Sequence, residues 1–242
     1  MGRDFVKELQ KEKNVDEIWM IARRKERLDV MAEKSNGRLR VLAFDLTDMG
    51  SFKYFEDFLT KEKPQILYLI NAAGAGRMGK VDEISCNDHA FVLDINVRAL
   101  TCMSRICLPY MGKGSHIILL CSGSAFLPQP EFASYAASKS YVLSFSRALR
   151  QEVKKEGISV TAVCPGPVNT EFFEAAGSEI APAKKRFLVE SKDVVRKAMK
   201  DAKSGKELSV YGMSMKLVHL AGKMLPTRVV LSVMNEMMNK HE

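Results

Sequence analysis

The chain has 242 residues, of which 46% are hydrophobic, and a formal net charge of +8. No run approaches the roughly 18 apolar residues that a bilayer-spanning helix needs, and the N-terminus lacks a secretory pattern. Basic residues are interleaved with acidic ones, as in Lys61-Glu62-Lys63, which is typical of solvated helix faces and gives no support for nucleic acid or a membrane as a partner.

Short apolar runs alternate with amphipathic segments, the pattern of repeated β-α units around a parallel sheet. The length suits one α/β domain over residues 1–242. Within it we expect a cofactor-binding and catalytic core at 1–170, a lid region at 171–203, and the last strand with C-terminal helices at 204–242. The expected strands are Ile18–Ile21, Leu39–Phe44, Ile66–Ile70, Ile117–Cys121, Ile158–Cys164 and Leu208–Tyr211.

Amphipathic segments between these runs are predicted to be helices. Phe52, Phe55 and Leu59 fall on one helix face. Ser85, with Asp88 three residues later, makes a capping box before a long helix that reaches Tyr110. A further helix is expected to start near Phe132. Its apolar residues form a continuous stripe, Val142, Phe145, Leu149 and Val153.

The last third of the chain carries two unusual segments. Glu171–Ser191 is irregular and stands where a substrate lid would lie. Met213–Leu225 is followed by Pro226 and a Met-rich helix at Val229–Met238. Because Met fills irregular gaps, we expect this tail to pack against the body or a second subunit rather than to lie on a membrane surface, although that alternative stays open.

The five cysteines are scattered, odd in number and mostly within apolar runs. They therefore indicate reduced core thiols and a cytoplasmic protein rather than a disulfide or zinc framework. The four histidines have no Cys or His partner at ligand spacing, so no metal site is expected. The cysteines are Cys86, Cys102, Cys107, Cys121 and Cys164.

Ser122, Tyr135 and Lys139 carry the strongest chemical signal. Tyr135 and Lys139 are four residues apart on a predicted helix and share a face, while Ser122 follows an apolar strand, where open α/β sheets place their ligands. A cation ~4 Å from a phenol contributes about 4 kcal/mol, or roughly three pK units. The expected shift of the Tyr135 pKa is downward, toward neutral pH, which suits proton exchange with a carbonyl or alcohol.

In context, these residues closely resemble the active-site signature of the short-chain dehydrogenase/reductase family, with Ser122 followed after twelve residues by Tyr135-Ala-Ala-Ser-Lys139. The resemblance runs from Met1 to about Thr170 and implies a Rossmann-like, doubly wound parallel sheet. Other motifs that resemble the family's are Asp45-Leu46, Asn71-Ala72-Ala73-Gly74, Ile95-Asn96-Val97 and Pro165-Gly166-Pro167-Val168-Asn169-Thr170.

The resemblance implies a role for each catalytic residue. Tyr135 would exchange the proton with the substrate oxygen, and Ser122 would polarise that oxygen. Lys139 would lower the Tyr135 pKa and bind the nicotinamide ribose, and Asn96 would support a water-linked proton path to Lys139. Ser124 is the alternative to Ser122.

The resemblance also implies cofactor contacts, each with a plainer reading. In these alternatives Asp45 serves merely as the cap of the next helix and Asn71 merely closes a turn. Pro165-Gly166 is then an ordinary loop. The residues expected to bind the cofactor are Gly2, Arg23, Arg24, Asp45, Leu46, Asn71, Ala72, Gly74, Tyr135, Lys139, Pro165, Gly166, Val168 and Thr170.

The strand Ile18–Ile21 runs into Ala22-Arg23-Arg24 with no acid at the turn. An acid there binds the 2′-hydroxyl of NAD, whereas Arg pairs with the 2′-phosphate of NADP. NADP is therefore expected over NAD, and NADPH favours carbonyl reduction.

The chain opens Met1-Gly2-Arg3-Asp4, which resembles only the end of the family's glycine-rich motif. The central first strand and most of that motif are expected to be absent from the 242 residues. We therefore expect an upstream extension in the working protein, because Ile18–Ile21 and Ile66–Ile70 would otherwise keep unpaired backbone groups that cost about 1–3 kcal/mol each if buried.

The leading hypothesis is an NADP(H)-dependent oxidoreductase that interconverts a carbonyl and a secondary alcohol. The lid's Phe172 and Phe173 and the Met-rich tail suit an apolar ketone. The resemblance also implies a homodimer or homotetramer formed through the long helices. The alternative is a catalytically idle relative that binds a nucleotide or a partner.

Overall fold

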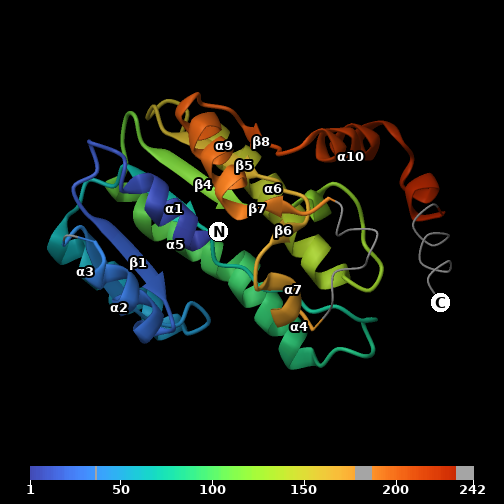
Figure 1. Ribbon diagram of the computed structural model, residues 1–242, viewed down its shortest axis with the longest axis horizontal. Coiled ribbons are helices and arrows are strands. Elements are labelled where there is room, and N and C mark those ends of the chain that lie inside the picture. The colour runs from blue at the N-terminus through green and yellow to red at the C-terminus, as the bar shows by residue number, and fades with distance from the viewer. Residues whose placement is uncertain (36, 178–186, 233–242) are drawn as a thin grey trace.

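The computed structural model describes residues 1–35, 37–177 and 187–232 (Figure 1). All six predicted strands are present, with ends within two residues of the prediction. Two short strands that the sequence did not predict, β6 (Val168–Asn169) and β7 (Val189–Glu190), pair with each other. The predicted strands are β1 (Ile18–Ala22), β2 (Leu39–Ala43), β3 (Tyr68–Asn71), β4 (His116–Leu120), β5 (Ser159–Val163) and β8 (Leu208–Ser209).

The strands form two separate parallel groups. One is a four-stranded sheet in the order β3-β4-β5-β8, and the other is the ribbon β1-β2. Within the described residues, β1 pairs only with β2 and β3 pairs only with β4. The carboxyl ends of β3, β4 and β5 lie at one edge of their sheet because the strands are parallel and in register, as Leu120↔Val163 shows.

Helices connect the strands, as the alternating pattern predicted. Asp48 caps the N-terminus of α3 by accepting from the backbone N–H groups of Gly50 and Ser51, and Ser85 caps α4 by accepting from Asp88 N–H. The helices are α1 (Gly2–Leu9), α2 (Lys25–Glu33), α3 (Met49–Glu62), α4 (Cys86–Leu93), η1 (Asp94–Ala99), α5 (Leu100–Cys107), η2 (Leu108–Tyr110), η3 (Gly123–Ala125), α6 (Ala133–Glu152), α7 (Phe172–Ala175), α9 (Ser191–Lys203) and α10 (Met213–Met224).

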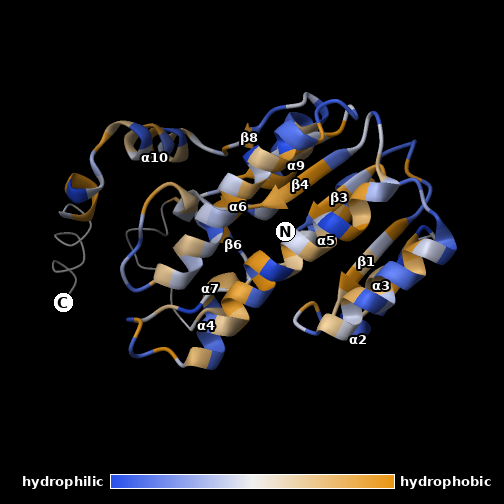
Figure 2. Ribbon diagram, turned by 180° about the vertical axis from the view of Figure 1, so that it is seen from behind, coloured by the Kyte–Doolittle hydropathy of each residue, from blue (hydrophilic) through white to orange (hydrophobic). Residues whose placement is uncertain are grey.

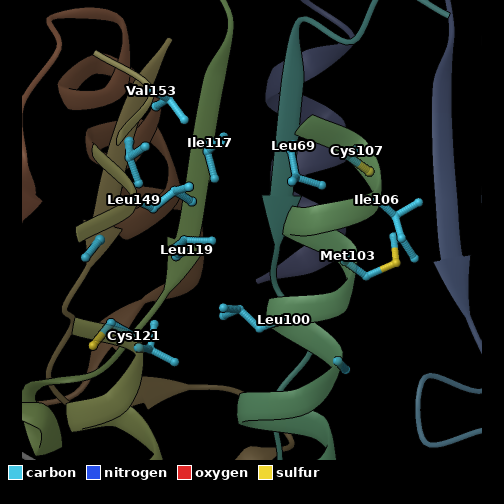
Figure 3. Close-up of a cluster of buried hydrophobic side chains, with 14 of the residues drawn as sticks. Leu69, Leu100, Met103, Ile106, Cys107, Ile117, Leu119, Cys121, Leu149 and Val153 are labelled. Carbon is cyan, nitrogen blue, oxygen red and sulfur yellow. The ribbon is translucent and has the colours of Figure 1, made fainter. Parts of the chain in front are cut away.

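Strand β4 shows why helices cover both faces of the sheet. Ile117 and Leu119 pack with residues of α3, α5 and α6 (Figure 3), whereas Ile118 and Leu120 pack with residues of α1, α2 and α9. Side chains alternate across a strand, so an unbroken apolar run needs an apolar layer on each side. Figure 2 shows this run as an orange strand between helices that carry polar residues.

The C-terminal helices were predicted only in part. Helix α10 matches the expected segment Met213–Leu225. The Met-rich helix expected at Val229–Met238 falls largely on residues 233–242, outside the described residues, as do residues 178–186 of the expected lid. Figure 1 shows α10 at the edge of the molecule, where the chain leaves the body.

Candidate active site

A cavity of about 3350 Å³ opens at the carboxyl ends of β3, β4 and β5. It extends between β1 and β3, since residues of both strands line it, including Met20, Ile21, Leu69 and Ile70. Open α/β sheets bind ligands at this edge. Ser122, Tyr135 and Lys139 all line the cavity, so the fold brings the three predicted catalytic side chains to one site.

Ser122 follows β4 in extended conformation and begins the short helix η3. Its hydroxyl accepts a hydrogen bond from Ser124 N–H at 3.1 Å and is also hydrogen-bonded to the Tyr135 phenol. The alternative residue, Ser124, directs its own hydroxyl to Gln129 at 3.1 Å. Of the two serines, Ser122 is therefore the one whose hydroxyl lies next to the Tyr135 phenol.

Tyr135 and Lys139 lie one turn apart on α6. Both are buried, at 8% and 3% exposure. The Lys139 ammonium lies 5.5 Å from the centre of the Tyr135 ring and donates to the Leu120 carbonyl at 2.9 Å. Since Leu120 ends β4, this bond ties the helix that carries the pair to the strand that precedes Ser122.

The pKa of Tyr135 does not follow the sequence-based expectation. Burial raises the pKa of the phenol, and the hydrogen bond to Ser122 offsets only part of that rise. Burial also lowers the pKa of Lys139 to about 8, with Cys121 and Cys164 acting in the opposite direction. The predicted downward shift of Tyr135 is thus wrong for this structure, because spacing on a helix reveals the nearby cation but not the loss of water around the phenolate.

Asn96 does not line the cavity but supports one of its walls. It lies in η1, a π-helical turn, and its side chain accepts from Ala75 N–H at 2.9 Å and donates to Ala75 O at 2.8 Å and to Ser138 Oγ at 2.9 Å. A Cβ on Gly74 would meet Asn96 Oδ1 at 3.4 Å and Lys139 Nζ at 3.5 Å. Asn96 thus holds the loop after β3 close to Lys139.

Most of the predicted cofactor residues line the same cavity. Asp45 does not, because its carboxylate accepts from the Thr47 backbone and hydroxyl at 2.8 Å each and faces Arg23 at 3.6 Å. The Asn71 side chain donates to Ser104 at 3.2 Å. The lining residues are Gly2, Arg23, Arg24, Leu46, Asn71, Ala72, Gly74, Tyr135, Lys139, Pro165, Gly166, Val168 and Thr170.

The two arginines after β1 differ in their surroundings. The Arg23 guanidinium pairs with Asp45 and lies over the Phe91 ring at 5.5 Å. Arg24 is exposed, and within the described chain its side chain has no hydrogen bond or ion pair. Arg23 and Arg24 line the same cavity as Tyr135 and Lys139, so the cavity offers cationic groups that could hold the phosphates of a dinucleotide.

Sequence reasoning missed the aromatic wall around Tyr135. Phe132 stacks on the Tyr135 ring with centroids 4.3 Å apart, and Phe172 lies 5.2 Å from it. A Cβ on Gly76 would lie 2.9 Å from the Cζ atoms of Phe132 and Phe172, so a larger residue there would have to displace these rings. The sequence places Phe172 in the lid, where it suits an apolar substrate, but no spacing rule brings it to Tyr135.

Two further neighbours were also missed. Cys121 directly precedes Ser122, and its thiol donates to the Lys139 carbonyl at 3.2 Å. Met215 of α10 packs against Gly123 and Gly166. Within the described residues, no three His, Cys, Asp or Glu side chains gather as a metal site would require.

Comparison with known proteins was consistent with this geometry. The family model described as short chain dehydrogenase matches residues 1–181. An uncharacterized oxidoreductase of Staphylococcus epidermidis is 27% identical over 170 residues, which cover 69% of this chain and 73% of that protein. The 11-beta-hydroxysteroid dehydrogenase-like 3 of Arabidopsis thaliana is 31% identical over 158 residues, covering 63% of this chain and 51% of that protein.

Solved structures share the fold. A short-chain dehydrogenase from Sphingobium yanoikuyae in complex with NADPH has a TM-score of 0.78 at 23% identity, covering 96% of this chain and 91% of that one. A short chain dehydrogenase/reductase from Burkholderia phymatum in complex with NAD has a TM-score of 0.78 at 20% identity, covering 92% and 89%. The chain therefore has an α/β, Rossmann-like fold with parallel strands.

Proposed function

Because this chain belongs to the short-chain dehydrogenase family, we propose that it is an oxidoreductase that uses NADP(H) to interconvert an apolar ketone and its secondary alcohol. The observation that carries the proposal is the meeting in one cavity of Ser122, which follows β4, with Tyr135 and Lys139 of α6. An NAD(P) cofactor, when bound, supplies or accepts the hydride, and the residues of this chain orient the substrate and move the proton.

The electrostatics of the site favour reduction. The raised pKa of Tyr135 keeps its phenol protonated at neutral pH, ready to donate to the substrate oxygen. Ser122 is hydrogen-bonded to the same phenol and can hold that oxygen beside it. The hydrogen bond with Ser122 stabilises the phenolate left after donation.

Arg23 and Arg24 are the residues we assign to the 2′-phosphate of NADP. Their guanidinium groups can bind a phosphate through paired hydrogen bonds, and no acid stands at the turn after β1 to favour a free hydroxyl. Asp45 partly neutralises Arg23, which leaves Arg24 as the stronger phosphate ligand.

The substrate class follows from the wall around Tyr135. Phe132 and Phe172 leave little polar surface next to the reacting phenol, and Met215 adds an apolar side chain from α10. Such a lining binds an apolar group beside the carbonyl more strongly than a hydroxylated one. The name of the Arabidopsis relative, a steroid dehydrogenase-like protein, agrees with this class.

We also propose that an additional parallel strand lies between β1 and β3 in the working protein. Support comes from the cavity that both strands line and from the edge that each leaves unpaired within the described residues. With such a strand present, the backbone amides of β1 would exchange with solvent more slowly than they do in the 242-residue chain.

The test of the proposed function is NADPH oxidation with a panel of apolar ketones. Tyr135→Phe should lower kcat by about 1000-fold, because general acid catalysis contributes roughly 100- to 10,000-fold. NADPH binding should change by less than about twofold. The matched control is Tyr141→Phe on the same helix, which removes only a hydroxyl bonded to Thr101 at 2.9 Å and should leave kcat unchanged.

A nucleotide- or partner-binding protein without catalysis is the second candidate. The observation that favours it is that, among the described residues, no strand pairs with β1 and β3 on the edges that border the cavity. NADPH binding without turnover of any ketone, or full activity in Tyr135→Phe, would overturn the oxidoreductase proposal.

A further inference from the structure

Helix α10 contacts the body through one face. Met215 packs against Gly166, where a Cβ would lie 2.9 Å from Met215 Cγ, and the His219 ring lies 4.4 Å from that of Phe126. A Cβ on Gly222 would lie 2.6 Å from the Phe126 carbonyl oxygen. These three residues place the helix directly over η3, next to the active site.

The opposite face of α10 is apolar and exposed. Met213, Leu217, Leu220 and Met224 have 72%, 63%, 52% and 72% of their surface exposed. At about 100° per residue they fall within an arc of about 60°, on the side turned away from Met215, His219 and Gly222. A stripe of four large apolar side chains on one surface helix marks an interaction site more than a solvated face.

The charge around this stripe indicates what covers it. No Asp or Glu occurs between Glu207 and Glu236, whereas Lys216, Lys223 and Arg228 are present. Lys216 and Lys223 lie on the same flank of the stripe. Antiparallel pairing of α10 with a second copy would bring these lysines together, and nothing acidic in the segment would offset the repulsion. A negatively charged, apolar surface complements both features.

We propose that the exposed face of α10 docks the protein on an anionic lipid surface. The helix would lie in the interface with its apolar stripe inserted and its lysines among the headgroups. Among the described residues, no helix has the length and hydropathy needed to cross a bilayer. Ser214, Met215 and Val218, from the other side of α10, line the active-site cavity, so docking would bring the cavity next to a source of apolar substrates.

This proposal goes beyond the proposed function and differs from what the sequence alone favoured. Met-rich and apolar residues in the tail were expected to pack against protein. The structure shows that only one side of α10 does so, while four large apolar side chains point away.

The experiment is co-sedimentation of the full chain with sucrose-loaded vesicles of phosphatidylcholine, alone or with about 30% phosphatidylglycerol. The apparent partition coefficient should be at least about tenfold higher on the anionic vesicles, since each cation near such a surface contributes roughly fivefold. Leu217→Glu with Leu220→Glu should lower it by tenfold or more. Lys216→Gln with Lys223→Gln should lower it by about 25-fold at low salt.

The matched control adds the same two charges elsewhere, as Val30→Glu with Val81→Glu, which are 51% and 62% exposed. It should bind like the unmodified chain. Circular dichroism and thermal unfolding verify that each variant is folded.

Three results would overturn the proposal. The first is equal binding of the unmodified chain to neutral and anionic vesicles. The second is vesicle binding by the Leu217→Glu/Leu220→Glu variant that equals that of the unmodified chain. The third is an unmodified chain that binds no vesicles but forms a dimer, which the same double substitution dissociates. Vesicle binding is measured without turnover, so it is independent of whether the protein reduces ketones.

Discussion

The four-stranded sheet β3-β4-β5-β8 and the ribbon β1-β2 differ in how fully they are buried. Ile117, Ile118 and Leu119 of β4 are 0% exposed and have helices on both faces. In β1 only Ile18 and Met20 are buried, and the strand borders the cavity on its unpaired side. Ser122 follows the well-packed sheet, whereas Arg23 and Arg24 follow the ribbon.

The site therefore has two parts that differ in local stability, one attached to the four-stranded sheet and the other to the ribbon β1-β2. Local opening is easiest where few apolar contacts hold the backbone, so the ribbon should open at lower free energy than the sheet. The positions of Tyr135, Lys139 and Ser122 depend on β4 and α6. The two arginines that we propose as ligands of the NADP 2′-phosphate lie at the end of the more weakly held strand.

The largest expected effect compares one core isoleucine from each part. Ile118→Ala should lower the free energy of unfolding by about 4 kcal/mol, because β4 cannot shift to fill the space. Ile18→Ala should cost about 2 kcal/mol, since β1 can relax toward the cavity. Urea denaturation of both variants gives the two values, and hydrogen exchange should show faster amides in β1 than in β4. Equal costs and equal exchange would remove the distinction between ribbon and sheet.

The next prediction concerns the burial of charge in the well-packed part. The folded-state pKa of Lys139, about 8, lies below its ordinary value of 10.5. The unfolded chain therefore binds more protons between pH 8 and 10.5, and stability should rise with pH across that window. At pH 7 the charged lysine destabilises the fold by about 3 kcal/mol, an order-of-magnitude value.

Lys139→Met should therefore raise the free energy of unfolding at pH 7 by up to about 3 kcal/mol and remove this pH dependence, while activity is lost. Denaturation at pH 7 and pH 10 measures both effects. The exposed Lys155→Met is the control and should leave the pH profile unchanged. A Lys139→Met variant that is less stable than the parent at pH 7 would show that Lys139 holds the sheet together rather than straining it.

The sequence predicted the elements of both parts well, for a local reason. A buried parallel strand is a continuous apolar run, so β4 and β5 could be located to within a residue or two. Ser122, Tyr135 and Lys139 could be predicted as neighbours because they stand at a fixed spacing along one helix and at one strand end, and the structure brings them to one cavity. The two-residue strands β6 and β7 have no such signal, because only pairing between distant segments defines them.

Contacts between distant segments explain what was missed in the site. Phe172 reaches Tyr135 from another segment, and Met215 comes from the tail. The direction of the Tyr135 pKa shift depends on burial of the phenol, beside the rings of Phe132 and Phe172. The Asp45 carboxylate binds Thr47 and faces Arg23, contacts that its position after a strand does not reveal.

The smallest expected effect lies at the end of the ribbon. Arg24→Ala should raise the KM for NADPH by about tenfold, because loss of one charged hydrogen-bonding partner of a phosphate corresponds to roughly 1.5–3 kcal/mol before solvent screening. The KM for NADH should change little, since NAD(H) carries no 2′-phosphate. Arg23→Ala should have a weaker effect because Asp45 already pairs with Arg23.

The control for this prediction is Lys25→Ala. It removes the same charge one residue further along, from a side chain held by Asp29 at 2.8 Å. Initial rates with both cofactors separate the outcomes. If Lys25→Ala raises the KM for NADPH as much as Arg24→Ala does, the preference for NADPH comes from the overall positive charge at this end of the ribbon and not from Arg24 itself. A change confined to Arg24→Ala assigns the selectivity to one guanidinium, and with it a specific function to the more weakly packed part of the fold.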